Sequence, residues 1–491
     1  MTLGDGVTHE VRELLETTAA EIPGSPYATQ LTALVERIDG PLRVAIAGRV
    51  KAGKSTLLNA LVGERLAPTD AGECTKIVSW FSHAAGYQVT ARLLDGSERT
   101  LAFKRDAGAL DIELGGLTER EVRSIRIGWP AKSLTDVTLI DTPGLASIND
   151  ENSRRTRDFL EVESDLTPEA DAVIYLMRHM HRSDMEFLDA FMDRSVSAAS
   201  PVNAVAVLSR ADEIGACRLD AMESAGRIAR RYREDPNVRS LAATVVPVAG
   251  LLAETGLTLR EDEVAALRTL VGTEAATLDL MLLSAEHFCE LHVSDLTVES
   301  RRELIDRLGM FGLRIAVREV AAGATTAAAL APKLVEHSGL GELRRVIVEH
   351  FMPRARLLKA RSALVAARMM VPELRTVHAA AADRLERGAE RIDASAIEFA
   401  RLRAAHLVSA AGLRLNDGET KDLERLLLGA TEAAALGLMD QAGPEQIKRT
   451  ALEAVARWRS RASDPLAEPA LVEVYETAAR TSESIYASEG A

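Results

Sequence analysis

The chain has little cysteine, few aromatic residues and no excess of positive charge. Its three cysteines are odd in number and widely spaced, which argues against a disulfide framework or a cysteine zinc site and favours a reducing, cytoplasmic setting. Aromatic residues make up only 4% of the 491 residues, too few for a rich base-stacking surface. The formal net charge of −14 argues against broad binding to nucleic acid, so we expect no nucleic-acid partner.

Long hydrophobic runs are also missing. No stretch approaches the roughly 18 uninterrupted apolar residues of a membrane-spanning helix, and the first residues show no basic segment followed by an apolar one. We therefore expect no spanning segment and no secretory signal, and any contact with a membrane should be peripheral. The apolar content of 47% is nonetheless ordinary for a globular protein.

Between about residues 42 and 248, short apolar runs alternate with helical patterns. Several runs are continuous rather than alternating, as expected for strands covered on both faces by helices. The pattern predicts an α/β unit with a mixed, mostly parallel sheet. The predicted strands are residues 42–47, 78–81, 89–94, 122–129, 137–140, 172–177, 204–208 and 244–248.

Helical periodicity dominates both ends of the chain. Two short helices are expected in the first forty residues, and from about Gly250 onward the strands stop. Some of the later helical patterns run for about thirty residues, well beyond the usual globular helix, which favours an elongated all-α bundle. We predict an α/β head at residues 41–250, with residues 1–40 and 251–491 forming a helical neck and trunk.

Residues 48–55 (GRVKAGKS) satisfy the pattern G-x-x-x-x-G-K-[ST] directly after a predicted strand and before an apolar helix. This context suits a P-loop, in which backbone N–H groups and the helix N-terminus point at phosphates. Lys54 would then contact the β- and γ-phosphates, and the Ser55 hydroxyl would coordinate Mg²⁺. The alternative is a chance glycine-rich turn between strand and helix.

Asp141 begins the sequence Asp-Thr-Pro-Gly after the predicted strand 137–140. A carboxylate at the end of a buried strand suits coordination of Mg²⁺, and Gly144 would offer its N–H to a γ-phosphate. By itself this sequence is also typical of a plain turn. The P-loop makes the nucleotide-binding interpretation the stronger one.

Ser209, Arg210 and Asp212 follow the predicted strand 204–208 and resemble the [NT]-K-x-D element with which GTPases recognise guanine. Asp212 would accept from the guanine N1–H and exocyclic amine, which adenine does not supply. Arg210 replaces the usual lysine, and its guanidinium can still stack along a base plane. Without the other motifs, a helix cap would explain these residues equally well. Residues 248–250 (VAG) stand where a short loop near guanine O6 belongs.

Two further positions concern the metal and the reaction. Thr75 lies between the P-loop helix and the strand 78–81, and we predict that it coordinates Mg²⁺, a loop threonine without a role being the alternative. Leu145 follows the Asp-Thr-Pro-Gly sequence, so the water-orienting glutamine of Ras-type enzymes is missing nearby. Water must then be positioned by other means. Lys51 is a candidate for placing positive charge on the transferring phosphate, or else a solvated lysine.

Taken together, the chain resembles bacterial dynamin-like GTPases. The resemblance rests on residues 48–56, Thr75, the distant Asp141, the degenerate sequence 209–212 and the long helical half. More than eighty residues separate Lys54 from Asp141, well beyond a minimal Ras-like domain, and residues 82–128 predict an added hairpin and strand pair. The resemblance implies a P-loop GTPase head, a helical neck and trunk, and nucleotide-dependent reshaping of membrane. Val50 departs from eukaryotic dynamins, which have glutamine there.

The segment 351–372 contains five basic residues and no acidic ones, a local reversal in an acidic chain. It ends at Pro372, where we expect the helix to break and expose an apolar turn. A basic stem beside an apolar turn suits an anionic lipid surface. The alternative is a solvated face and a bend packed in the core. The membrane-contact candidates are Arg361, Arg368, Met369, Met370, Val371 and Arg375.

The sequence thus predicts a GTPase that binds GTP or GDP with Mg²⁺ and acts at the inner face of the plasma membrane, on anionic phospholipid. Self-association or a related dynamin-like partner is also expected. Two alternatives stay open: a GTP-regulated switch or scaffold without membrane remodelling, and a P-loop protein that uses ATP. Lys51, Lys54 and Thr75 are the catalytic candidates, and Ser55, Thr75 and Asp141 are the metal ligands. The predicted nucleotide-binding residues are Gly48, Arg49, Val50, Lys51, Ala52, Gly53, Lys54, Ser55, Thr56, Asp141, Gly144, Ser209, Arg210, Asp212, Val248, Ala249 and Gly250.

Overall fold

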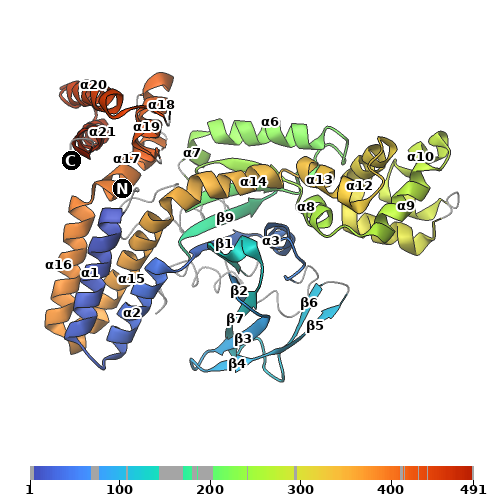
Figure 1. Ribbon diagram of the computed structural model, residues 1–491, viewed down its shortest axis with the longest axis horizontal. Coiled ribbons are helices and arrows are strands. Elements are labelled where there is room, and N and C mark those ends of the chain that lie inside the picture. The colour runs from blue at the N-terminus through green and yellow to red at the C-terminus, as the bar shows by residue number, and fades with distance from the viewer. Residues whose placement is uncertain are drawn as a thin grey trace.

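The protein is elongated, with a sheet in the middle and helical groups on both sides of it (Figure 1). This computed structural model describes residues 5–67, 77–106, 109–142, 170–179, 185, 203–239, 241–291, 296–409, 413, 415–429, 431–439 and 441–488. Within them, none of the helices combines the length and the apolar composition that crossing a bilayer requires.

The central sheet is mixed and mostly parallel, as predicted. Its strand order is β11-β10-β9-β1-β8-β2-β7-β3-β4. The strands β1, β8, β9, β10 and β11 are parallel, β2 is antiparallel to β8, and β7 is parallel to β2. The sheet is formed by β1 (Leu42–Gly48), β2 (Val78–His83), β3 (Gln88–Leu93), β4 (Glu98–Thr100), β7 (Val122–Trp129), β8 (Val137–Asp141), β9 (Ala172–Met177), β10 (Ala204–Ser209) and β11 (Val245–Val248).

Helices cover both faces of the parallel strands. Every residue of β9 and β10 is buried, which explains their continuous apolar sequences. One face packs against α3 (Lys54–Val62), α8 (Gly250–Leu257) and α14 (Leu340–Val346). The other face packs against α6 (Ala221–Glu234) and the short α7 (Pro236–Arg239). The carboxyl ends of β1, β8 and β10 therefore lie at the same end of the sheet, between the two helical layers.

The antiparallel extension of the sheet contains the predicted hairpin. The turn between β3 and β4 includes Gly96, whose φ of 84° suits glycine, and Asp95 accepts a hydrogen bond from the Ser97 backbone. The sequence did not predict the separate two-stranded sheet of β5 (Ala102–Asp106) and β6 (Ala109–Glu113). These strands are short and only half apolar, so they lack the continuous apolar runs that marked most of the others.

The helices after β11 fall into two groups on opposite sides of the sheet (Figure 1). The first group shares a core with α8 and lies beyond the edge that carries β11. It contains α9 (Glu261–Val271), α10 (Ala275–Met281), α11 (Ala285–Glu290), α12 (Val298–Ala321) and α13 (Ala327–His337). From there α14 leads back across the sheet. The predicted domain boundaries stay predictions, but the helices after Gly250 do not form one bundle.

The second group begins with a four-helix bundle from both ends of the chain. The first two helices pack on α15 and α16 in one apolar core. The bundle contains α1 (Asp5–Glu21), α2 (Pro26–Asp39), α15 (Ala355–Val377) and α16 (Ala379–Ser395). Beyond it lie α17 (Ile397–Ser409), α18 (Asp417–Leu428), α19 (Glu432–Ala435), α20 (Pro444–Ala462) and α21 (Pro469–Ser488).

The predicted exposed apolar turn at Pro372 is wrong. Helix α15 continues through Pro372 to Val377, and the preceding Met370 and Val371 are only 8% and 4% exposed. Their packing in the four-helix core stabilises the helix across the proline. The helical path is instead interrupted earlier, by a π-helical turn at Ile347–Phe351 and a 3₁₀ turn at Met352–Arg354.

Several basic residues of this segment contact protein groups, and the lipid-facing role of the segment stays a prediction. Arg354 donates to the carbonyls of His350 and Leu428, and Lys359 donates to the Gly40 carbonyl at 2.7 Å. Arg368 pairs with Asp393 at 3.6 Å. Further along, Arg375 pairs with Asp383 and Glu386, Arg361 lies beside Asp393 in a small pocket, and Met369 is half-buried.

A buried polar cluster joins the four-helix bundle to the sheet. Arg37 of α2 donates to Asp171 at 2.7 Å, and both side chains are almost fully buried. Asp171 precedes β9 and also accepts from the Ser362 hydroxyl of α15 at 2.6 Å and from the Arg43 N–H of β1 at 2.9 Å. Removing one partner from a buried ion pair leaves an uncompensated charge, so this contact fixes the bundle against the sheet.

Candidate functional site

The loop between β1 and α3 has the backbone that a phosphate site requires. Gly48 has a φ of 147°, and a Cβ there would lie 2.5 Å from the Leu176 carbonyl oxygen, so glycine is needed at this close approach. Lys51 and Gly53 have left-handed φ values of 62° and 94°. The chain then enters α3 at Lys54. The loop therefore wraps around the N-terminus of α3, where backbone N–H groups favour an anion.

Lys54 lies inside this loop rather than in solvent. Its side chain is 9% exposed, and Nζ donates to the carbonyls of Gly48 at 3.3 Å and Arg49 at 3.4 Å. Burial lowers the pKa of Lys54, and the nearby Asp141 carboxylate opposes that effect. The ammonium group is thus held at the centre of the loop by long, weak contacts that a phosphate oxygen can replace.

Ser55 and Asp141 lie together at the ends of α3 and β8. The Ser55 hydroxyl donates to Asp141 Oδ2 at 2.9 Å, while the buried Oδ1 has no hydrogen-bond partner among the described residues. Burial raises the pKa of Asp141, and Lys54 and Ser55 lower it in turn. A hydroxyl and a carboxylate with an unused oxygen fit Mg²⁺, which prefers oxygen ligands and would satisfy that atom.

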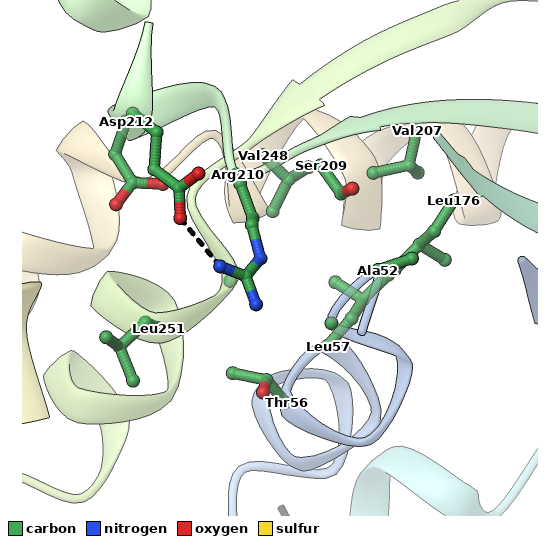
Figure 2. A pocket seen from close by; sticks show the side chains of 13 residues that line it. Ala52, Thr56, Leu57, Leu176, Val207, Ser209, Arg210, Asp212, Val248 and Leu251 are labelled. Carbon is green, nitrogen blue, oxygen red and sulfur yellow. Dashed lines mark hydrogen bonds and ion pairs between the residues drawn. The ribbon is translucent and has the colours of Figure 1, made fainter. Parts of the chain in front are cut away.

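A pocket of about 180 Å³ opens from the P-loop toward the carboxyl ends of β10 and β11. Figure 2 shows Thr56 and Leu57 of α3 on one side, Val207 and Ser209 of β10 on another, and Leu251 of α8 opposite. Ala52 and Gly53 of the P-loop also line it. The pocket is therefore continuous with the predicted phosphate site, as a nucleoside attached to a bound phosphate requires.

Asp212 and Arg210 present the polar groups of this pocket. Asp212 is 9% exposed, and burial raises its pKa. Arg210 has a left-handed φ of 51°, and its side chain extends into the pocket (Figure 2), where Nη1 donates to Glu213 Oε1 at 2.8 Å. Ser209 donates to the Met177 carbonyl at 3.2 Å, which ties β10 to β9. A buried carboxylate at this pocket suits recognition of N–H donors.

The remaining predicted residues take different places. Val248 and Gly250 line the pocket, whereas Ala249 is buried and its N–H donates to the Ser338 carbonyl at 2.8 Å. Val50 is 51% exposed at the outer side of the P-loop, next to the exposed Arg49 and Lys51. Thr75 and Gly144 lie outside the described residues, so their predicted roles stay predictions.

Two residues that line the pocket, Glu213 and Leu251, were not predicted from the sequence. Glu213 pairs with Arg210, and its spacing of three residues in the sequence was a usable signal for that contact. Leu251 lines the pocket from the first turn of α8, but an apolar residue at a helix start gives no sign of such a position.

Comparisons with known proteins agree with this geometry. A family model described as the dynamin family matches residues 44–203. The isoniazid-induced protein IniC of Mycobacterium tuberculosis is 38% identical over 488 residues, which are 97% of this chain and 98% of IniC. The isoniazid-induced protein IniA of the same organism is 29% identical over 247 residues, or 48% of this chain and 35% of IniA.

Solved structures of bacterial dynamins also resemble the chain. One, described as an oligomerised bacterial dynamin pair, matches 99% of this chain and 75% of its own with 14% identity and a TM-score of 0.30. A likeness at that level carries no argument beyond its agreement with the relatives above.

Proposed function

The chain belongs to the dynamin family, together with IniC, and from that membership we propose that it hydrolyses GTP with Mg²⁺ and couples the nucleotide cycle to membrane remodelling. Its GTPase domain carries the P-loop and the base pocket described above. The products are GDP and phosphate. The protein acts in the cytoplasm, on anionic phospholipid at the inner face of the plasma membrane, and associates with itself or with a related dynamin-like protein.

The observation that carries the proposal is the pair formed by Ser55 and Asp141 beside Lys54. A buried carboxylate oxygen without a partner is costly, and Mg²⁺ on a nucleotide would satisfy it. The pair lies at the N-terminus of α3, and the pocket that contains Asp212 begins next to it, at Gly53 and Thr56. Phosphate, metal and base positions thus follow one another along one edge of the sheet.

In the proposed mechanism, the chain's residues position the triphosphate rather than form covalent bonds to it. Lys54 moves from the Gly48 and Arg49 carbonyls to the β- and γ-phosphates, and the N–H groups of the P-loop surround them. Ser55 and Asp141, with Thr75, would hold Mg²⁺, which would supply positive charge beside the phosphates. Lys51 adds positive charge to the transferring phosphate.

In the base pocket, the proposed contacts match the hydrogen-bond donors and the flat ring of guanine. The Asp212 carboxylate accepts from N1–H and the exocyclic amine, and these bonds favour its ionised form against the effect of burial. The Arg210 side chain, already extended into the pocket, stacks along the base. An adenine base offers no such pair of donors, which favours GTP over ATP.

Liposomes of stated charge test the membrane part of the proposal. Protein, Mg²⁺ and GTP are mixed with vesicles containing phosphatidylserine or with purely neutral vesicles, and vesicle size and phosphate release are followed together. We expect a GTP-dependent change in size on the anionic vesicles only, with GDP as the matched control. Tight GTP binding without any change in vesicle size would instead support the alternative of a GTP-regulated switch.

A further inference from the structure

Helix α12 is broken beside the base pocket. Gly309 has φ 63° and ψ 175°, a conformation that is essentially restricted to glycine, and it interrupts an otherwise helical segment from Val298 to Ala321. A Cβ at Gly309 would lie 3.7 Å from Leu251 Cδ2 and 3.9 Å from Asp212 Oδ2. The break thus brings the α12 backbone against a pocket wall and against the base-recognition carboxylate.

The break is held by polar contacts from α8 and α9. In an unbroken helix the Arg307 carbonyl would accept from the Phe311 N–H, but here the Thr255 hydroxyl of α8 donates to it. The Arg307 side chain donates to Glu263 of α9 at 2.7 Å and to the Thr258 carbonyl at 3.0 Å. The Thr255 hydroxyl thus pairs with a backbone carbonyl at the break, and the Arg307 side chain fixes the preceding turn to α8 and α9.

One turn after the break, Arg314 connects α12 to the segment that follows Asp212. Its guanidinium donates to the carbonyls of Ala216 at 3.1 Å and Cys217 at 2.6 Å. It also donates to the Leu282 carbonyl at 2.8 Å and the Leu283 carbonyl at 3.1 Å, at the end of α10. A single cation therefore bonds two segments that are distant in the sequence, through carbonyls alone.

The segment bonded by Arg314 is strained. Gly215, Ala216 and Cys217 all have left-handed φ values, of 64°, 59° and 59°, and two of them carry a side chain. Such a conformation costs on the order of 1 kcal/mol or more per residue and persists only where the surroundings enforce it. The Arg314 bonds to the Ala216 and Cys217 carbonyls supply that enforcement.

The Asp212 carboxylate also acts electrostatically on Cys217 of the strained segment. Burial raises the pKa of the Cys217 thiol, the Asp212 carboxylate adds to this rise, and a hydrogen bond with the Phe311 backbone lowers it. Phe311 is the second residue after the break in α12. Three residues of α12, Gly309, Phe311 and Arg314, therefore lie against or bond to the loop that contains Asp212.

We propose that α12 positions Asp212 for guanine, with Gly309 and Arg314 as positioning residues that set discrimination between guanine and bases that lack its exocyclic amine. This inference rests on the proposed GTP-binding function. Neither residue touches the nucleotide. They act by holding residues 212–217, and α12 in turn connects the base pocket to the helices α9–α13.

The test compares affinities for GTP and for ITP, whose base lacks the 2-amino group that Asp212 accepts. Binding of each nucleotide with Mg²⁺ is measured by calorimetry for the full chain, Arg314→Ala, Arg314→Lys and Gly309→Ala. Arg318→Ala is the matched control, because Arg318 lies one turn further along α12 and pairs with Glu319 and His337 rather than with the loop. Thermal melting of each variant is recorded alongside.

We expect the unchanged chain to bind GTP at least about tenfold more tightly than ITP, since one bond to a charged acceptor is worth that much. Arg314→Ala should bring this ratio toward one while the affinity for ITP, which depends on the phosphate contacts, changes less than about threefold. Arg314→Lys retains charge but fewer bonds, so its ratio should be intermediate. Gly309→Ala should lower the ratio too, and Arg318→Ala should leave it unchanged.

Loss of protein stability alone lowers both affinities together and leaves their ratio intact, so the ratio separates positioning from general damage. If Arg314→Ala does not fold, Arg314→Lys decides the matter by the same ratio. A wild-type ratio in folded Arg314 variants would overturn the inference alone. Equal and measurable affinity of the unchanged chain for GTP and ITP would overturn the inference, because the 2-amino group would then not be recognised, whereas binding of neither nucleotide would overturn the proposed function.

Discussion

At the phosphate end of the site, residues 48–55 supply the glycine loop, the lysine and the metal-binding hydroxyl from one continuous segment, and Asp141 joins them from the end of β8. At the base end, Asp212 follows β10, Leu251 begins α8, and α12 lies behind them, about a hundred residues after Asp212. The first end is specified locally. The second depends on how distant helices pack.

This difference has an energetic counterpart. The phosphate end uses backbone conformation that glycine permits, at Gly48 and Gly53, and Lys51 is the one residue with a side chain that has a left-handed φ in this loop. The base end contains strained residues without glycine, at Ala216 and Cys217, and bonds from Arg314 of another helix hold them. A local site is robust to changes elsewhere, whereas a site held from a distance is open to influence from the helices that hold it.

The largest effect should come from Lys54→Ala. Without the ammonium group the loop loses its charged contact with the β- and γ-phosphates, and we expect at least about 100-fold weaker binding of GTP and of GDP. Titration with a fluorescent guanine nucleotide measures both. Lys132→Ala, a change of an exposed lysine in the same head, is the control and should bind normally. Normal turnover in Lys54→Ala would rule out the P-loop assignment.

A smaller and more selective effect is expected for Asp212→Asn at the base end. The amide donates where the carboxylate accepted, so affinity for GTP should fall about tenfold or more while xanthosine triphosphate, with its 2-oxo group, should bind better. Competition between GTP and xanthosine triphosphate measures which of the two nucleotides each protein binds more tightly. The phosphate end should be untouched, so ATP binding stays weak in both proteins. Strong ATP binding by the unchanged chain would favour the ATP-using alternative.

The smallest effect concerns stability. Burial raises the pKa of Asp141 above its unfolded value, so its contribution to the free energy of unfolding is greatest below about pH 4 and is lost as pH rises through the folded pKa. Asp141→Asn removes this pH-dependent loss of stability, because the amide does not ionise. At neutral pH and without Mg²⁺, the variant should be more stable by about 1 kcal/mol, an advantage that shrinks as the pH falls toward 4.

Urea unfolding at several pH values, with and without Mg²⁺ and GDP, measures the difference in stability. Added metal and nucleotide should stabilise the unchanged chain but not Asp141→Asn, because the variant has lost a metal ligand. A variant less stable than the unchanged chain at neutral pH in metal-free buffer would contradict the cost that we assign to the Asp141 carboxylate.

Local pattern explains which parts of the molecule could be predicted from the sequence. The sheet strands and the loop around Lys54 follow from continuous apolar runs and from glycine spacing, and the structure confirms the fold class. The apolar turn expected at Pro372 is wrong for a long-range reason. Nothing local shows that Arg354 donates to Leu428, seventy-four residues away, or that Val371 packs against helices from the start of the chain.

The base end shows the same limit within a single site. Asp212 carried a motif that indicates a role, whereas nothing in the sequence 308–313 (LGMFGL) indicates that this helix lies against Asp212. A glycine in such a pattern does not reveal a break. Only the position of α12 against α8 and residues 212–217 shows why Gly309 adopts a conformation closed to other residues.

The buried cluster around Asp171 has a consequence for how force would pass through the molecule. Strands β1 and β9 pair in parallel along their length, with Gly48 and Leu176 at the nucleotide edge and Arg43 and Asp171 at the opposite edge. Two hydrogen-bonded strands of six or seven residues form a stiff rod of about 20 Å. The phosphate loop and the contacts to α2 and α15, made through Arg37 and Ser362, therefore lie at the two ends of one strand pair with no intervening loop.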